Sequence, residues 1–543
     1  MLPLLLLGCG AEPEPLDDVQ RAVRASLMLR GHRPTEPEVD ALRARATTVD
    51  QLAASWVRQP AFAETVADWH AEFLLLRHDT MAPLPPIGVL EGTEGQELIE
   101  ALTESPLRLI AHQVEMGTPV SEWFAGRDTA TNAAGARLWG LPYDDTGPDW
   151  QITQWPSDVP AAGLLADHGL WMRHISSDTN HHRTRANLIH TAWLCEDLAQ
   201  RTLEIGTLDL ADPVAVSTAL QTDPACAGCH EVLDPVAAAL AGFDRYVLPA
   251  EITEAMEGGC IDSDPHCYPI DLYRPDTLAD HTAMDLPSPA LGGVEVDGLE
   301  GLGSALVADP RFAPCMARRW LSYSRQQPLD EVSPADVVEL AEVFVASGHD
   351  IATLAWASVS GHKLNTVPSQ HVRPEATARD VERLTGFRWL ADPDGGQCEG
   401  ELCWGAVDLG LHARWGFRDM AGGIDATASV HPVHSPSTMG HLTTARLAEL
   451  AADHVVRNDF QAAPSGRLLL TEIEPLDTEV ESVTRQIMVL HRRILAEHTD
   501  DSDPGIAETV GLWQRVHQST QDSHEAWRAV IAALLQAPER RVY

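Results

Sequence analysis

The chain has 543 residues, and its 80 acidic side chains outnumber its 38 basic ones, which gives a formal net charge of -42 at pH 7. A chain of this length ordinarily folds as several domains, and its hydrophobic content of 44% is that of a folded protein rather than a disordered one. The acidic excess argues against binding to nucleic acid or to an anionic lipid surface. It favours a solvated acidic surface and leaves room for cationic partners.

The first nine residues read MLPLLLLGC, an apolar run that ends at Gly8 and Cys9. The run is short for a signal peptide and lacks a basic start. It nevertheless resembles the bacterial lipoprotein signal, in which the cysteine becomes the lipidated first residue. We therefore predict a signal over residues 1–9, a lipid anchor at Cys9 and a polar tether over residues 10–18, the alternative being an incidental cysteine at an incomplete start. No apolar run is long enough to predict a membrane-spanning helix.

Helical periodicity covers most of the remaining chain. Thr35 and Glu38 form a capping-box pattern at the start of one helix, and the Gln59-Pro60 step separates two others. Helices are expected over residues 17–46 and 47–77 (two in each), 97–124, 163–175, 184–203, 301–324, 333–348 and 350–361.

Segments rich in proline and glycine interrupt this pattern, and we expect loops there. They cover residues 81–96, 125–160, 245–300, 365–375 and 392–437. Alternating patterns typical of strands are rare, and GRLLLTEI, residues 466–473, is the best of them. The predicted fold class is mainly α.

The sequence CAGCH, residues 226–230, carries the clearest chemistry. Fewer than about 0.01 copies of C-x-x-C-H are expected by chance from the composition of the chain. Two thiols at this spacing can reach both vinyl groups of a haem, and the histidine that follows supplies an axial nitrogen to the iron. We therefore predict one covalent haem c, attached at Cys226 and Cys229, with His230 as its proximal ligand. CAGCH is expected where a loop gives way to a helix.

Two other interpretations of CAGCH remain open. A redox dithiol ordinarily lies in a thioredoxin-like βαβ context, which the pattern does not provide. A zinc site needs a second pair of ligands, which Cys260 with His266 or Cys267 could supply.

Six cysteines remain once Cys9 and the CAGCH pair are set aside, and an even number is what an oxidising compartment allows. They are expected to pair as Cys260 with Cys267, Cys398 with Cys403, and Cys195 with Cys315, although spacing does not prove connectivity. Reduced, buried cysteines of a cytosolic protein are the alternative.

The stretch CAGCHEVLDPVAAALAGFDRY, residues 226–246, resembles planctomycete-type cytochrome c domain proteins, in which the motif is followed by Asp-Pro and a helix that ends in Phe-Asp. The matching residues here are Asp234, Pro235, Phe243 and Asp244. FAPCMARRWLSYSRQQPLD and LMLRGHRPTEPEV are similar to the downstream segment and to the companion N-terminal helical domain of that class. The likeness covers roughly residues 20–365. It implies a haem protein with companion domains of unknown function.

The sequence leaves the sixth iron ligand open. We place Met284 there, with Met256, Met316, His266 and His174 as alternatives, and a methionine would raise the reduction potential relative to a histidine. For each of these residues the alternative is an ordinary core or solvated side chain.

A basic cluster in SSDTNHHRTR includes Arg183 and Arg185, which we expect to meet the haem propionates. The alternative is an exposed polar loop before a helix. Farther along, His431, His434 and His441 could contribute to a metal or substrate pocket, or could lie in a structural loop.

These observations predict a multi-helical N-terminal region over residues 19–200, a cytochrome c-like haem region with following helices over residues 201–365, and a C-terminal helical domain over residues 366–543. The expected function is that of a lipid-anchored, mono-haem c-type cytochrome of the cell envelope, facing the periplasm or anchored in the outer membrane. It would transfer single electrons with a redox partner protein or a small-molecule donor. Two alternatives are a haem-dependent oxidoreductase with a substrate site in its helical domains, and a non-catalytic surface lipoprotein with disulfides and no haem.

Overall fold

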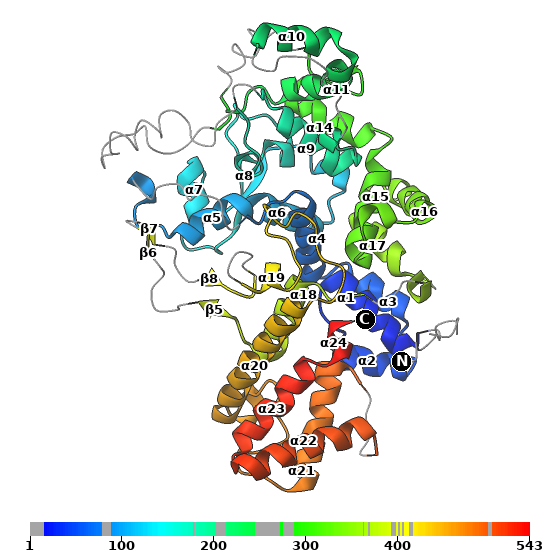
Figure 1. Cartoon of the computed structure of the whole chain (residues 1–543), viewed down its shortest axis with the longest axis vertical. Helices are drawn as coiled ribbons and strands as arrows, with labels where there is room; N and C mark the ends of the chain where they lie inside the picture. Colours follow the sequence, from blue (N-terminus) through cyan, green and yellow to red (C-terminus); the bar gives the residue numbers. More distant parts are fainter. Residues whose placement is uncertain are drawn as a thin grey trace, which may run out of the picture.

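A computed structural model describes residues 16–78, 88–177, 180–200, 212–244, 272–274, 287–361, 363–366, 370–391, 398–399, 402–403, 407–411, 416–497 and 502–542. The fold is mainly α, as predicted, with short antiparallel strand pairs between the helices. Figure 1 shows an elongated arrangement, with α10 and α11 at one end of the long axis and α21, α22 and α23 at the other.

The first four helices confirm the predicted capping and break positions. They are α1 (Asp18–Arg30), α2 (Glu36–Arg43), α3 (Val49–Trp56) and α4 (Pro60–Phe73). Thr35 and Glu38 form the predicted capping box at the start of α2, and α4 begins at Pro60. Gly31 ends α1 in a left-handed conformation (φ 67°), which glycine adopts without steric strain.

The next part of the chain is more ordered than the sequence predicted. Residues 125–160, expected as loop, contain the strands β1 (Asp128–Thr131) and β2 (Gln151–Gln154), paired antiparallel, and the helix α7 (Ala133–Trp139) between them. The expected helices around them are α5 (Gly95–Thr103), α6 (Ser105–Glu115), α8 (His168–Arg173) and α9 (Arg183–Leu194).

The CAGCH sequence lies in α11, which follows α10 after a single-residue break at Asp223. The elements of this region are α10 (Pro213–Thr222), α11 (Pro224–Ala239), the strand pair β3 (Ala290–Leu291) and β4 (Val294–Glu295), α14 (Gly298–Ala308), α15 (Phe312–Arg325), α16 (Pro334–Ala346) and α17 (Ile351–Val359). One hydrophobic core includes residues from most of the described helices between Ala22 and Leu364. A disulfide joins Cys195, at the end of α9, to Cys315 in α15, as the sequence had suggested.

A second hydrophobic core, from Val381 to Leu535, holds the C-terminal helices together. They are α18 (Pro374–Thr385), α19 (Phe417–Met420), α20 (Thr438–Gln461), α21 (Val480–Leu490), α22 (Pro504–Thr520), α23 (Ser523–Leu535) and α24 (Pro538–Arg541). Helix α23 packs between α20 and α22, and α21 packs on α22. The short strands β5 (Leu390–Ala391), β6 (Cys398–Glu399), β7 (Leu402–Cys403) and β8 (Val407–Asp408) pair as β5 with β8 and β6 with β7, which sets Cys398 opposite Cys403 along the backbone.

The strand predicted at residues 466–473 is wrong, because this segment is irregular. The buried carboxylate of Asp459 accepts hydrogen bonds from the backbone amides of Leu468, Leu469 and Leu470, each at 2.8 Å. A carboxylate that binds three successive amides takes the donors that a strand would give to a neighbour. The three leucines are therefore fixed by a side chain rather than by a sheet.

Buried ion pairs connect the two cores. Asp68 of α4 is buried and binds Arg77 (2.6 Å) and Arg379 of α18, while Arg77 also binds Glu104 (2.7 Å). Arg373, just before α18, pairs with Glu72 of α4. No helix in the described part of the chain is both long and apolar enough to cross a membrane.

Candidate haem-attachment site

Helix α11 presents the three residues of the motif together. Cys226 and Cys229 are half-buried, unpaired thiols, and the three-residue spacing sets them on neighbouring turns of the same helical face. His230, also half-buried, follows directly. A side chain added at Gly228, between the two thiols, would meet no described atom within 4 Å. None of the described residues therefore covers the helix at Gly228.

Asp234, one helical turn after His230, connects the motif to α9. The Nδ1 atom of His230 lies 3.2 and 3.3 Å from the two carboxylate oxygens of Asp234. Because a carboxylate only accepts, the imidazole donates from Nδ1. Arg183 donates two hydrogen bonds to the same carboxylate, from Nε (2.6 Å) and Nη2 (3.0 Å). Arg183, Asp234 and His230 thus form a continuous hydrogen-bonded series.

The charge of Asp234 is stabilised in place. Burial alone would raise the pKa of Asp234, but the hydrogen bonds from His230 and Arg183 outweigh it and hold that pKa below its ordinary value. The carboxylate is therefore ionised at neutral pH and remains an acceptor for the His230 ring. Sequence reasoning noted Asp234 only as part of the Asp-Pro pattern, although the four-residue spacing on a helix was a signal for its contact with His230.

The start of α9 sets the position of Arg183. His181 and His182 both have left-handed backbone angles (φ 50° and 65°), which are uncommon for residues other than glycine, and α9 begins immediately after them. His182 is buried, and its Nδ1 atom accepts a hydrogen bond from Arg185 at 3.1 Å. This tight turn fixes Arg183 in the first turn of α9, where it meets α11.

Arg185 has partners other than the propionates expected from the sequence. Its guanidinium is buried and donates to the backbone carbonyls of His174 (2.7 Å), Asp244 (2.9 Å) and Trp171 (3.1 Å). These bonds join α8, α9 and the chain that leaves α11. The guanidinium of Arg183 likewise binds a protein group, the carboxylate of Asp234. Both residues therefore support the site through protein contacts.

The Phe-Asp pair after α11 anchors that helix in the core. Phe243 is fully buried, and its ring lies 5.9 Å from those of His168 and Trp171 and 5.1 Å from that of Tyr273. Asp244 donates its amide to Leu272 (2.8 Å). The end of the motif-bearing helix is therefore fixed independently of any bound group.

The structure describes only two of the residues considered for the sixth ligand. His174 is half-buried, its Nε2 atom lies 2.7 Å from the carbonyl oxygen of Leu74, and loss of contact with water lowers its pKa to about 3. Met316, in α15, lies in the first hydrophobic core and has no exposed surface. Met284, Met256 and His266 lie outside the described residues, as do Cys260, Cys267 and the N-terminal Cys9.

The three C-terminal histidines do not gather around one point. His441 accepts a hydrogen bond from Arg541, and burial is the main cause that lowers the pKa of His434 to about 4. Within the described ranges, no three His, Cys, Asp or Glu side chains are close enough to hold a metal ion.

The residues of α11 fit the attachment of a haem on chemical grounds. The structure supplies two unpaired thiols at the required spacing and a histidine whose Nδ1 is engaged by a carboxylate. In the described residues, Asp234 is the one polar partner of His230, so Nε2 is left for a metal. A carboxylate on the outer nitrogen is the common arrangement behind metal-binding histidines.

Comparison of the chain with protein-family models, with curated proteins and with solved structures yields no match. The resemblance to planctomycete-type cytochromes therefore stays a prediction carried by the motif residues. Any functional proposal depends on the chemistry of α11 and its neighbours.

Proposed function

We propose that this protein is a mono-haem c-type cytochrome that transfers single electrons in the cell envelope. The observation that carries the proposal is the pairing of two unpaired thiols, Cys226 and Cys229, with a histidine held at Nδ1 by Asp234. Cys226 and Cys229 would form the thioether links, and His230 would bind the iron through Nε2. Haem supplies an iron that cycles between the ferric and ferrous states.

The chain's own residues then have defined tasks. Asp234 keeps the proton of His230 on Nδ1 and increases the basicity of Nε2, and Arg183 holds Asp234 in place. Arg185 and Phe243 hold the chain that leaves α11 against α9 and α8, through the Arg185 bond to Asp244 and the contact of Phe243 with Trp171. A rigid attachment helix suits electron transfer, which requires that the ligand geometry change little between oxidation states.

Two further features support an extracytoplasmic setting. The disulfide between Cys195 and Cys315 is typical of an oxidising compartment, which is where haem c is attached. The resemblance of residues 1–9 to a lipoprotein signal supports a lipid anchor at Cys9. We keep Met284 as the proposed sixth ligand, and the net charge of -42 favours a redox partner with a cationic docking face.

The decisive experiment is expression with an export signal in a host that matures c-type cytochromes. The purified protein should retain one haem through denaturing electrophoresis, and its mass should exceed the polypeptide mass by one haem. Cys226→Ser combined with Cys229→Ser should abolish covalent haem, whereas Cys195→Ser combined with Cys315→Ser, which removes two other cysteines, should leave it. Absence of haem from the folded, exported wild-type protein would overturn the proposal in favour of a haem-free lipoprotein.

Spectra of the loaded protein would then identify the distal side of the iron. A far-red sulfur-to-iron band that disappears in Met284→Ala is the expected result. A high-spin ferric spectrum would instead indicate an open position and favour a haem-dependent oxidoreductase.

A further inference from the structure

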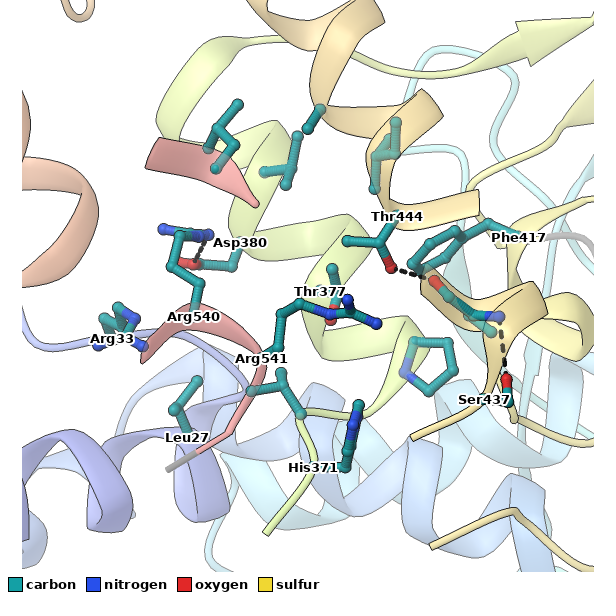
Figure 2. Close-up of a pocket in the computed structure, with 18 of the residues that line it drawn as sticks. Leu27, Arg33, His371, Thr377, Asp380, Phe417, Ser437, Thr444, Arg540 and Arg541 are labelled. Atoms are coloured by element: carbon teal, nitrogen blue, oxygen red, sulfur yellow. Dashed lines mark hydrogen bonds and ion pairs between the residues drawn. The ribbon is translucent and has the colours of Figure 1, made fainter. Parts of the chain in front are cut away.

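A pocket far along the chain from the CAGCH motif has an unusual charge. It opens where α1 of the first core meets α18, α20 and α24. Figure 2 shows Arg33, Arg540 and Arg541 on one side and Ser437, Thr444 and Phe417 on the other. A junction between two packed cores is a common place for ligand sites.

The pocket has more positive than negative charge. Its one lining carboxylate, Asp380, is buried and already binds Arg540 (2.5 Å) and, outside the lining, Arg383 (3.2 Å). Although burial would raise it, these arginines together with Arg33 hold the pKa of Asp380 below its ordinary value. The carboxylate is therefore ionised and fully used by cations that surround it.

Arg541 is the cation left over. Its guanidinium donates to a histidine nitrogen, that of His441, and no carboxylate lies within ion-pair distance of it in the described part of the chain. The Arg541 side chain is half-buried, and this burial lowers its pKa. Figure 2 shows its side chain reaching across the pocket from α24 toward the side that carries Thr444.

Two helix starts add to the positive potential. Pro374 and Thr377 of the first turn of α18 line the pocket, and so do Ser437 and Gly440 at the start of α20. The amino-terminal ends of helices carry a partial positive charge and favour anions. The rest of the wall is apolar and includes Leu27, Val381, Phe417 and Leu447.

We propose that this pocket binds a small organic carboxylate, with Arg541 as its charged contact and the apolar wall around the hydrocarbon part. A guanidinium matches the geometry of a carboxylate through two parallel hydrogen bonds. The mixed polar and apolar lining fits a monocarboxylate with a compact apolar body better than an inorganic ion. The proposal does not depend on haem at α11, so the two can fail separately.

The test is calorimetric titration of the purified full-length protein with benzoate and hexanoate, each compared with its neutral amide, and with inorganic phosphate. The wild-type protein should bind the carboxylates at least tenfold more tightly than the amides. Arg541→Gln should weaken carboxylate binding at least tenfold. Arg446→Gln, on the exposed side of α20 where the arginine pairs with Glu449, is the matched control and should bind as the wild type does.

A second variant guards against loss of folding in Arg541→Gln. Ser435 is exposed at the pocket rim, so Ser435→Trp should block entry without disturbing the core, and circular dichroism should be unchanged. Equal affinity for carboxylates and amides, or full binding by both variants, would overturn the proposal. Binding of phosphate with no binding of either carboxylate would also overturn it, because the site would then accept an inorganic anion.

Discussion

Replacing Asp234 by asparagine is the sharpest test of how the proposed haem ligand is held. The substitution keeps the size of the side chain and removes its charge. At present the carboxylate accepts from Arg183 (2.6 and 3.0 Å) and from His230 Nδ1 (3.2 Å). An amide has one oxygen to offer and two protons that repel these donors. The Asp234→Asn variant therefore loses at least one of the two contacts.

The size of the effect follows from the nature of the bonds. A hydrogen bond that involves a charged group contributes about 1.5–3 kcal/mol. A carboxylate at Nδ1 makes the imidazole more basic and stabilises ferric iron relative to ferrous iron. If about 1.4 kcal/mol of that preference is lost, the reduction potential rises by about 60 mV, since a tenfold change in a one-electron equilibrium corresponds to 59 mV. The potential of Asp234→Asn should therefore increase by roughly that amount.

The measurement is a spectroelectrochemical titration of the haem-loaded protein. Glu231→Gln is the matched control, because Glu231 is an exposed carboxylate on the same helix whose charge is screened by water and salt, and the potential of this variant should change much less than that of Asp234→Asn. Arg183→Gln should shift the potential in the opposite direction, because loss of this positive charge leaves the Asp234 carboxylate less neutralised and favours ferric iron. A potential for Asp234→Asn equal to that of the control would refute the role given to Asp234.

Three further predictions concern the scaffold. Replacing both Cys195 and Cys315 by serine opens a loop with a sequence separation of 120, and urea unfolding should show a loss of about 4 kcal/mol; an unchanged midpoint would contradict this. Burial raises the pKa of Asp68, but its two arginine partners lower it to about 2 from 3.8, so its stabilisation is complete above pH 4 and is lost as the pH falls to 2. The free energy of unfolding should therefore fall by about 2 kcal/mol over that pH range. In Asp68→Asn, the dependence of this free energy on pH should be weaker. Arg185→Lys keeps the charge but offers one nitrogen to several carbonyls, so thermal unfolding should reveal a loss of about 2 kcal/mol or more, whereas exposed Arg446→Lys should have no effect.

The helices of the N-terminal part could be predicted because their signals are local. The capping box of Thr35 and Glu38 and the proline at residue 60 define the starts of α2 and α4 within a few residues of sequence. The strand expected at residues 466–473 failed because Asp459, outside that window, binds its amides. The pairing of β1 with β2 was missed because it joins residues on opposite sides of α7, and a short window contains no trace of it.

The candidate site divides in the same way. Cys226, Cys229 and His230 all lie within α11, which follows α10 after one residue, whereas the sequence predicted that the motif would lie where a loop gives way to a helix. Arg183 lies 51 residues from Asp234, and no local pattern could connect the two. The contact of Arg183 with a haem propionate, expected from the sequence, stays a prediction.

Buried arginines reveal how this chain distributes its charge. Among the described residues, the buried arginines are Arg24, Arg30, Arg33, Arg185, Arg418, Arg467 and Arg540. Most of them donate to backbone carbonyls, as Arg418 does to Ile424 and Arg467 does to Ile473. A guanidinium has five donors in a fixed plane and can satisfy several such carbonyls at once, which an ammonium group cannot do equally well.

This use of arginine changes the surface as well as the core. Each cation withdrawn into the interior leaves the exterior more acidic than the net charge of -42 spread evenly would suggest. Buried acids offset only part of this, because the described buried carboxylates are aspartates, five in all: Asp68, Asp167, Asp244, Asp380 and Asp459. An acidic exterior repels anionic partners and steers cationic ones. A small anion that reaches the pocket at Arg541 must therefore bind through local charge and apolar contact, against the field of the whole protein.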